Sequence, residues 1–139
     1  MESLKRFQDA HQQHFGKALA EIKNGKKLSH WMWFIFPQVK GLGLSETSKF
    51  YAIENSTEAR QFLDHPVLGA NLVAISTELL KLNTNNATTV FGQPDDMKLL
   101  SCMTLFSGLP GTDPVFKKVI DKYFDGKQDL QTIQLLEGE

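Results

Sequence analysis

Residues 3–24, SLKRFQDAHQQHFGKALAEIKN, are the stretch that decides the fold class. One set of side chains recurs at steps of three and four residues: Leu4, Phe7, His11, Phe15, Leu19 and Ile22. This spacing is typical of an amphipathic helix that buries one face, with Gln8, Gln12, Lys17 and Glu21 mainly on the solvent side. We expect Ser3 to cap its start and Gly25 to end it in the left-handed conformation.

After this helix, the chain reads as further short helices separated by glycine, proline and asparagine. Ser45 or Thr47 can cap one helix, and Asn55 or Ser56 can cap the next, with Glu58 in capping-box position. The predicted ranges are 45–53, 57–63, 66–82, 87–91, 94–107, 114–124 and 129–136. The sequence therefore predicts a mainly α fold, a single compact domain over residues 1–139 with about six to eight short helices and at most minor strands.

The composition excludes several classes of protein. Hydrophobic residues make up 41% of the 139 residues, which is enough for a continuous core. Fifteen basic and sixteen acidic residues give a net charge of −1, which argues against binding nucleic acid through bulk charge. One cysteine excludes an internal disulfide framework. No apolar run approaches the roughly 20 residues that cross a bilayer, and the polar start lacks a secretion signal. We expect a cytoplasmic protein without membrane contact.

Residues 29–38, SHWMWFIFPQ, form the first candidate site. Every residue from Trp31 to Pro37 is apolar, so the pattern fits a buried strand and a buried short helix equally well. Indole rings can stack on a ligand ring, and a glutamine can hydrogen-bond to its polar edge. The candidate ligand-binding residues are His30, Trp31, Trp33 and Gln38. The alternative is that the block is core, above all at residues 34–36.

A glycine loop and the helix start behind it form the second candidate site. Residues 40–45, KGLGLS, combine Gly41 and Gly43, whose free backbone amides can cradle a phosphate, with the charge of Lys40. The alternative is a connecting loop with glycines at positive φ.

The following residues add polar groups to this loop. Ser45 and Ser48 can cap a helix, and Tyr51 lies one turn after Ser48. Glu46 would be held ionised in the first turn, where it could act as a base or orient a ribose. The alternative is an ordinary N-cap with a solvated charge.

Other polar residues carry weaker signals. His65, Asp95, Asp96, Lys98 and Ser101 form a further set, for which capping and solvation are the simpler interpretation. His11 and His14 lie one helical turn apart but lack a third ligand, so no metal site is predicted. Cys102 lies on an apolar helix and is expected to be a buried thiol.

Several of these motifs together resemble a bacterial family known as domain of unknown function eighteen-ten. The matching segments are SHWMWFIFPQ (29–38), GLG (41–43), YAI (51–53), HPVLG (65–69), FG (91–92), KL (98–99) and SCMTLF (101–106). The resemblance spans nearly the whole chain and implies a single, mainly helical domain. Some members are labelled calpastatin, but calpain inhibitors are disordered and polar, whereas this chain has a core.

A second resemblance, to the NADAR group, rests on the order of the YAI, HPVLGANL, Phe-Gly and Lys-Leu segments. It implies a role in NAD and ADP-ribose metabolism, as an N-glycosidase acting on ribosyl-linked substrates. Under this resemblance the glycine loop would meet phosphates, Trp31 or Trp33 would stack on a ring, and Glu46 would be the nearest acidic catalytic residue.

The sequence thus predicts a protein that binds or hydrolyses an ADP-ribose-like or ribosylated nucleotide, with no cofactor. For hydrolysis, Glu46 or Asp96 would orient water or stabilise oxocarbenium-like charge at the anomeric carbon. The alternative is a non-enzymatic helical module that binds a nucleotide or a protein partner through its aromatic block.

Overall fold

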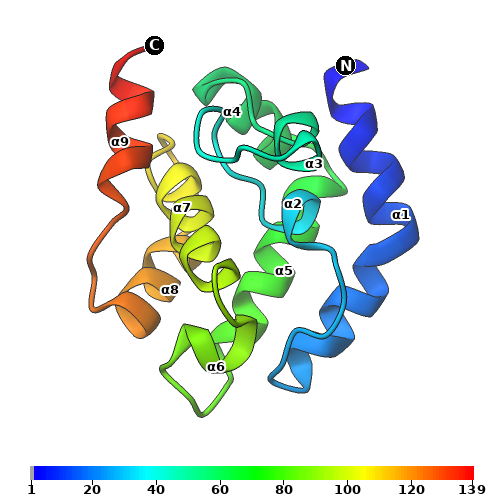
Figure 1. Ribbon diagram of the computed structural model, residues 1–139, viewed down its shortest axis with the longest axis vertical. Coiled ribbons are helices and arrows are strands. Elements are labelled where there is room, and N and C mark those ends of the chain that lie inside the picture. The colour runs from blue at the N-terminus through cyan, green and yellow to red at the C-terminus, as the bar shows by residue number, and fades with distance from the viewer. Residues whose placement is uncertain (1) are drawn as a thin grey trace.

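A computed structural model describes residues 2–139 as a set of helices joined by short loops (Figure 1). The helices are α1 (Glu2–Lys23), α2 (Met32–Ile35), α3 (Glu46–Phe50), α4 (Ser56–Asp64), α5 (Leu68–Leu80), α6 (Ala87–Phe91), α7 (Asp95–Ser107), α8 (Val115–Phe124) and α9 (Leu130–Glu137). The predicted mainly α class is confirmed. The described residues contain nine helices rather than six to eight, because the block 29–38 contributes α2. Their β-type pairing is limited to an isolated parallel bridge between Val39 and Ile53.

The helix ends follow local capping chemistry. Ser45, not Thr47, caps α3, and its hydroxyl accepts a hydrogen bond from the Ser48 amide at 3.1 Å. Asn55, not Ser56, caps α4 by accepting from the Glu58 amide at 3.0 Å. Gly25 follows α1 with a φ of 83°, as predicted. The predicted cap at the other end of α1 was wrong, because the helix already begins at Glu2 and includes Ser3.

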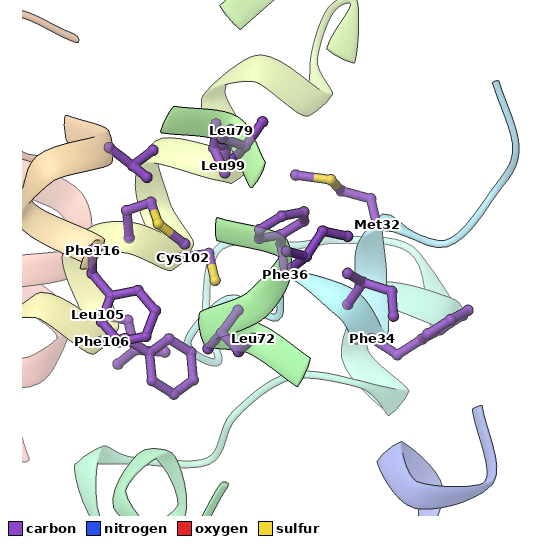
Figure 2. Close-up of a cluster of buried hydrophobic side chains, with 14 of the residues drawn as sticks. Met32, Phe34, Phe36, Leu72, Leu79, Leu99, Cys102, Leu105, Phe106 and Phe116 are labelled. Atoms are coloured by element: carbon purple, nitrogen blue, oxygen red, sulfur yellow. The ribbon is translucent and has the colours of Figure 1, made fainter. Parts of the chain in front are cut away.

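The core is organised around α5 and α7, which run through the middle of the molecule in Figure 1. Helix α5 packs against α1, α4 and α8, and α7 packs against α4, α6, α8 and α9. Figure 2 shows where the buried side chains of these helices meet those of the block 29–38. Burying one such side chain stabilises the fold by about 1.5–3 kcal/mol, so this cluster supplies much of the driving force for folding.

The crossing of α4 and α5 depends on Gly69. A Cβ atom at this position would lie 1.9 Å from the carbonyl oxygen of Leu63. Real Cβ atoms do not approach an oxygen this closely, so the two backbones can meet here only because the residue is glycine.

The aromatic block, residues 29–38, forms one helical turn, α2, and then continues as non-helical chain. The Ile35 amide donates to the Trp31 carbonyl at 3.2 Å, and the Phe36 amide donates to the Met32 carbonyl at 3.1 Å. All residues from Trp31 to Pro37 are buried except Trp33, which is half-buried. The block is therefore mostly core, with one tryptophan at the surface.

No helix within residues 2–139 is both long enough and apolar enough to span a membrane.

Candidate functional site

The glycine loop belongs to a longer loop, residues 40–52, whose two ends are joined at its base. The Lys40 amide donates to the Ile53 carbonyl, and the Ile53 amide donates to the Gln38 carbonyl, both at 2.8 Å. We call this segment loop 40–52; it contains α3. The base bonds hold the loop beside the aromatic block that precedes it.

A small cavity lies between loop 40–52 and α2. Its wall includes five of the predicted site residues: Trp33, Gln38, Gly43, Ser48 and Tyr51. Met32, Phe36, Val39, Ala52 and Lys98 complete the lining. The cavity has room for about 10 Å³ of water-sized space, which corresponds to roughly one water molecule. The structure thus brings residues from both predicted candidate sites to the wall of one small cavity.

An open groove continues from this cavity. Gln38, Gly43 and Lys98 line both hollows, and the groove has a volume of about 380 Å³. The start of α7 and the start of α9 provide its other walls, through Pro94, Met97, Ser101, Asp129 and Gln131, together with Leu42. We call this hollow the Lys98 groove. Met97 is 54% exposed here.

Three polar side chains of the cavity wall, those of Trp33, Gln38 and Tyr51, have no hydrogen-bond partner within the described residues. Within residues 2–139, no side-chain hydrogen bond joins Trp33, Gln38 or Tyr51 to another residue, and none of their polar atoms is buried without a partner. These atoms therefore face water.

Lys98 is the cation of the groove and is only loosely held. Its Nζ lies 3.7 Å from an Asp95 carboxylate oxygen, while Lys27 binds the other oxygen of Asp95 at 3.0 Å. Since Lys27 is the closer partner of this carboxylate, the Lys98 ammonium can turn toward an anion in the groove.

The carboxylate of the groove is already engaged. Asp129 accepts hydrogen bonds from the Ser101 hydroxyl at 3.1 Å and from the Thr132 hydroxyl at 2.5 Å. The Thr132 amide donates to the same oxygen at 3.2 Å, so Asp129 acts as the cap of α9. All three donors bind Oδ2 and fix the orientation of the carboxylate, and no hydrogen bond to its Oδ1 is found among the described residues.

Trp31 lies in the core, apart from the cavity, and cannot stack on a ligand in this structure. It is 1% exposed, and its Nε1 donates to Glu21 at 2.9 Å. Glu21, which was predicted on the solvent face, is also buried and accepts from the Leu28 amide and from the Ser29 amide and hydroxyl. Burial raises the pKa of Glu21, but the hydrogen bonds from Ser29, Leu28 and Trp31 outweigh it and lower the pKa to about 2.

Four of the other predicted ligand-binding residues border the site without lining it. His30 is exposed, and its ring stacks beside Trp33 with the ring centres 6.5 Å apart. Lys40 is exposed and pairs with Glu54 at 3.2 Å. Gly41, at a φ of 109°, packs against Leu135. The Ser45 hydroxyl donates to the Ser48 hydroxyl at 2.9 Å.

The two predicted catalytic carboxylates lie outside both hollows. Glu46 is exposed in the first turn of α3 and lines neither the cavity nor the groove. Asp96 is buried and accepts from the Thr88 hydroxyl at 2.6 Å and from the Met97 amide at 2.8 Å. This placement gives no geometric support to a catalytic role for either residue.

The sequence interpretation assigned Lys98 and Ser101 to a weak polar set and did not include Asp129 or Gln131. Residues 129 and 131 reach the groove only because α9 packs on α7, a tertiary contact without a local sequence signal.

The structure offers no alternative metal site. Among the described residues, no group of three or more His, Cys, Asp or Glu side chains is arranged to hold a metal ion. The ring nitrogens of His11 are both used, by the Phe34 carbonyl and the Asn71 amide.

Comparisons with known proteins agree with the first of the two resemblances. A family described as "Protein of unknown function (DUF1810)" matches residues 1–136. The chain is also similar to the crystal structure of the conserved hypothetical protein Rv1873 from Mycobacterium tuberculosis, with 36% identity, 96% of each chain covered and a TM-score of 0.94. No curated protein matches the chain. Neither match points to the NADAR group.

Proposed function

The chain belongs to the DUF1810 family, whose description assigns no activity, and from this premise we propose that the protein binds a nucleotide-like ligand in the Lys98 groove and the adjoining cavity. The ligand class is a phosphorylated ribose that carries a flat ring, as in AMP or ADP-ribose. The proposal is for binding without turnover.

The observation that carries the proposal is the convergence of unpartnered polar side chains on one hollow. Trp33, Gln38 and Tyr51 keep their polar atoms open to solvent, and Lys98 adds a positive charge. Lysine is a common point-charge partner for phosphate. The groove volume of about 380 Å³ lies within the range of about 300–1,000 Å³ that is typical of small-molecule sites.

Binding of the ring beside Trp33 requires loop 40–52 to move. The cavity holds roughly one water molecule as it stands, so a ring can enter only when the loop opens. The phosphate end needs no such change, because the groove at Lys98 is already open.

Hydrolysis is not part of the proposal, because the two carboxylates predicted to catalyse it, Glu46 and Asp96, line neither hollow. N-glycosidic cleavage needs a carboxylate to orient water or to stabilise charge at the anomeric carbon. Asp129 does line the groove, where its Oδ2 accepts from Ser101 and Thr132 as the cap of α9.

The test is a thermal-shift and tryptophan-fluorescence titration with ADP-ribose, AMP, NAD, ribose-5-phosphate and adenine. The phosphorylated riboses should raise the melting temperature by mass action, and adenine alone should not. Trp33→Phe should remove the fluorescence change, because Trp31 is buried away from the site. Lys98→Gln should weaken binding about tenfold, the usual effect of losing a hydrogen bond to a charged group.

The control is Lys118→Gln, which removes an exposed lysine of α8 that lines neither the cavity nor the groove. It should leave binding unchanged. If no phosphorylated ribose shifts the melting temperature, or if Lys98→Gln and Lys118→Gln bind equally well, the proposed function is wrong. Release of a free base during the titration would show that the site hydrolyses its ligand.

A further inference from the structure

A second hollow lies on another face of the molecule, between α1 and α5, and the proposed function does not use it. It has a volume of about 460 Å³ and runs along α1 from Gln8 to Gly16, with Val67 and Asn71 on its far side. We call it the α1–α5 groove. It shares no lining residue with the Lys98 groove.

Gly16 is a feature of this groove that packing within the protein does not explain. It lies inside the 22-residue helix α1, where glycine is less stable than alanine by about 1 kcal/mol. A Cβ atom there would meet nothing within 4 Å, so no neighbouring element requires a glycine. Its effect on the surface is to leave the groove floor open, as glycines do where a ligand approaches the backbone closely.

Next to Gly16, the groove presents the aromatic ring of Phe15, with the ring of His11 buried beside it. The rings of His11 and Phe15 are parallel within 1°, with centres 6.0 Å apart. Phe15 is half-buried and Val67 is 52% exposed, so the groove offers apolar contact from two sides. A flat ring is the shape that stacks on the partly exposed ring of Phe15.

The polar groups of the groove are carboxamides. Within the described residues, the side chains of Gln8 and Gln12 make no hydrogen bond to another residue. Asn71 uses one N–H for the His11 Nδ1 and keeps its oxygen and second N–H. Each free carboxamide can donate and accept, which matches a ligand edge that also does both.

The charge distribution favours a neutral ligand. No Asp, Glu, Lys or Arg side chain lines the groove among the residues that the structure describes.

From these observations we propose that the α1–α5 groove is a second binding site, for a neutral planar ring with an amide-like edge, the chemistry shared by nucleobases and aromatic carboxamides. The ring lies over Gly16 against Phe15, and the edge pairs with Gln8, Gln12 and Asn71.

The test uses benzamide and two analogues, one that changes the amide edge and one that changes the ring. Benzamide is flat and neutral, benzoate is flat and anionic, and cyclohexanecarboxamide is neutral but not flat. In NMR titrations, benzamide should shift the side-chain NH₂ signals of Gln8, Gln12 and Asn71 with a dissociation constant on the order of 1 mM, as expected for a fragment of this size. Equal binding of benzoate or cyclohexanecarboxamide would overturn the proposal.

Two matched pairs of variants locate the site. Gly16→Leu should fill the groove and abolish the shifts without unfolding the helix, because the new side chain enters open space. Gln13→Leu, at an exposed position of α1 that does not line the groove, should leave binding unchanged. Gln12→Glu should weaken binding about threefold, because an ionised carboxylate only accepts and the N–H donors of the carboxamide are lost, whereas Gln13→Glu should not.

The outcome is independent of the proposed function. Benzamide binding at this groove should leave Trp33 fluorescence unaltered, and Lys98→Gln should not affect it. If benzamide shifts no carboxamide signal, or if Gly16→Leu binds as well as the parent protein, the proposal is overturned, whatever the result for the Lys98 groove.

Discussion

At the scale of single residues, His11 couples folding to protonation. Its Nε2 must donate to the Phe34 carbonyl at 2.8 Å, so its Nδ1 is the acceptor for the Asn71 amide at 3.1 Å. Burial lowers the pKa of His11 from 6.5 to about 4; the Phe34 carbonyl opposes this shift, and the charge of His65 adds to it. The folded protein therefore keeps His11 neutral where the unfolded chain is already protonated.

This predicts a loss of stability in mild acid. The folded pKa lies below the unfolded one, so the contribution of His11 is present above about pH 6.5 and is lost as the pH falls toward about 4. Urea denaturation should show a loss of about 2 kcal/mol between about pH 7 and pH 5. His11→Gln should remove this slope. His14→Gln, at an exposed position of the same helix, should keep it; a slope that persists in His11→Gln would contradict the assignment.

At the scale of elements, we compare two helical glycines: Gly69, at the contact of α4 with α5, and Gly16, in the open face of α1. Gly69→Ala should destabilise the protein by about 3 kcal/mol, because the new methyl group overlaps the Leu63 carbonyl and the helices must separate. Gly16→Ala should stabilise it by about 1 kcal/mol, because nothing opposes the gain in helix propensity. Equilibrium denaturation measures both values, and effects of the same sign would show that the helix crossing is not as tight as described.

Helices whose hydrophobic residues recur at steps of three and four could be predicted from the sequence. Helix α2 has no such spacing and could not. The stripe from Leu4 to Ile22 and the breaker at Gly25 define α1 locally, so its range was correct to within one residue at each end. Residues 31–37 are all apolar, so their sequence does not show which face is buried. Whether they form a helix depends on the neighbouring elements that cover them. A local pattern could therefore predict that the block is core, but not that Trp33 alone would reach the surface.

At the scale of the whole molecule, stability is unevenly distributed. Helices α5 and α7 each pack against three or more other helices, whereas α9 packs mainly on α7 and buries only Thr132 among its residues. Elements with few buried contacts open locally, below the free energy of global unfolding. The amides of α9 should therefore exchange with solvent first, and those of α5 and α7 last.

Native-state hydrogen exchange in low denaturant tests this order. Exchange in α9 should be insensitive to denaturant, while exchange in α5 should follow global unfolding. Asp129 and Gln131 line the Lys98 groove, so a ligand there should slow exchange in the first turn of α9. Identical denaturant dependence in α9 and α5 would contradict the prediction.

The candidate site could be predicted only in the part that is continuous in sequence. Trp33, Gln38, Gly43, Ser48 and Tyr51 lie within about 20 residues of one another, and the structure brings them to one cavity. Asp129 and Gln131 join them through packing of distant helices, which no local pattern encodes. Trp31 and Asp96 carry the right chemical groups, but the fold turns both inward, toward Glu21 and Thr88.

The bridge between Val39 and Ile53 has a consequence for how such a protein can diversify. Loop 40–52 leaves and rejoins the helical core at these two adjacent residues, and Arg6 of α1 holds its last turn by donating to the Phe50 and Ala52 carbonyls. The stretch 44–47 between these anchors is exposed. The entropy of closing a flexible loop rises with the logarithm of its length, and doubling the length costs about 0.6 kcal/mol. Insertions at residues 44–47 can therefore reshape the rim of the cavity beside Trp33 while the contacts of the loop with the helices are kept.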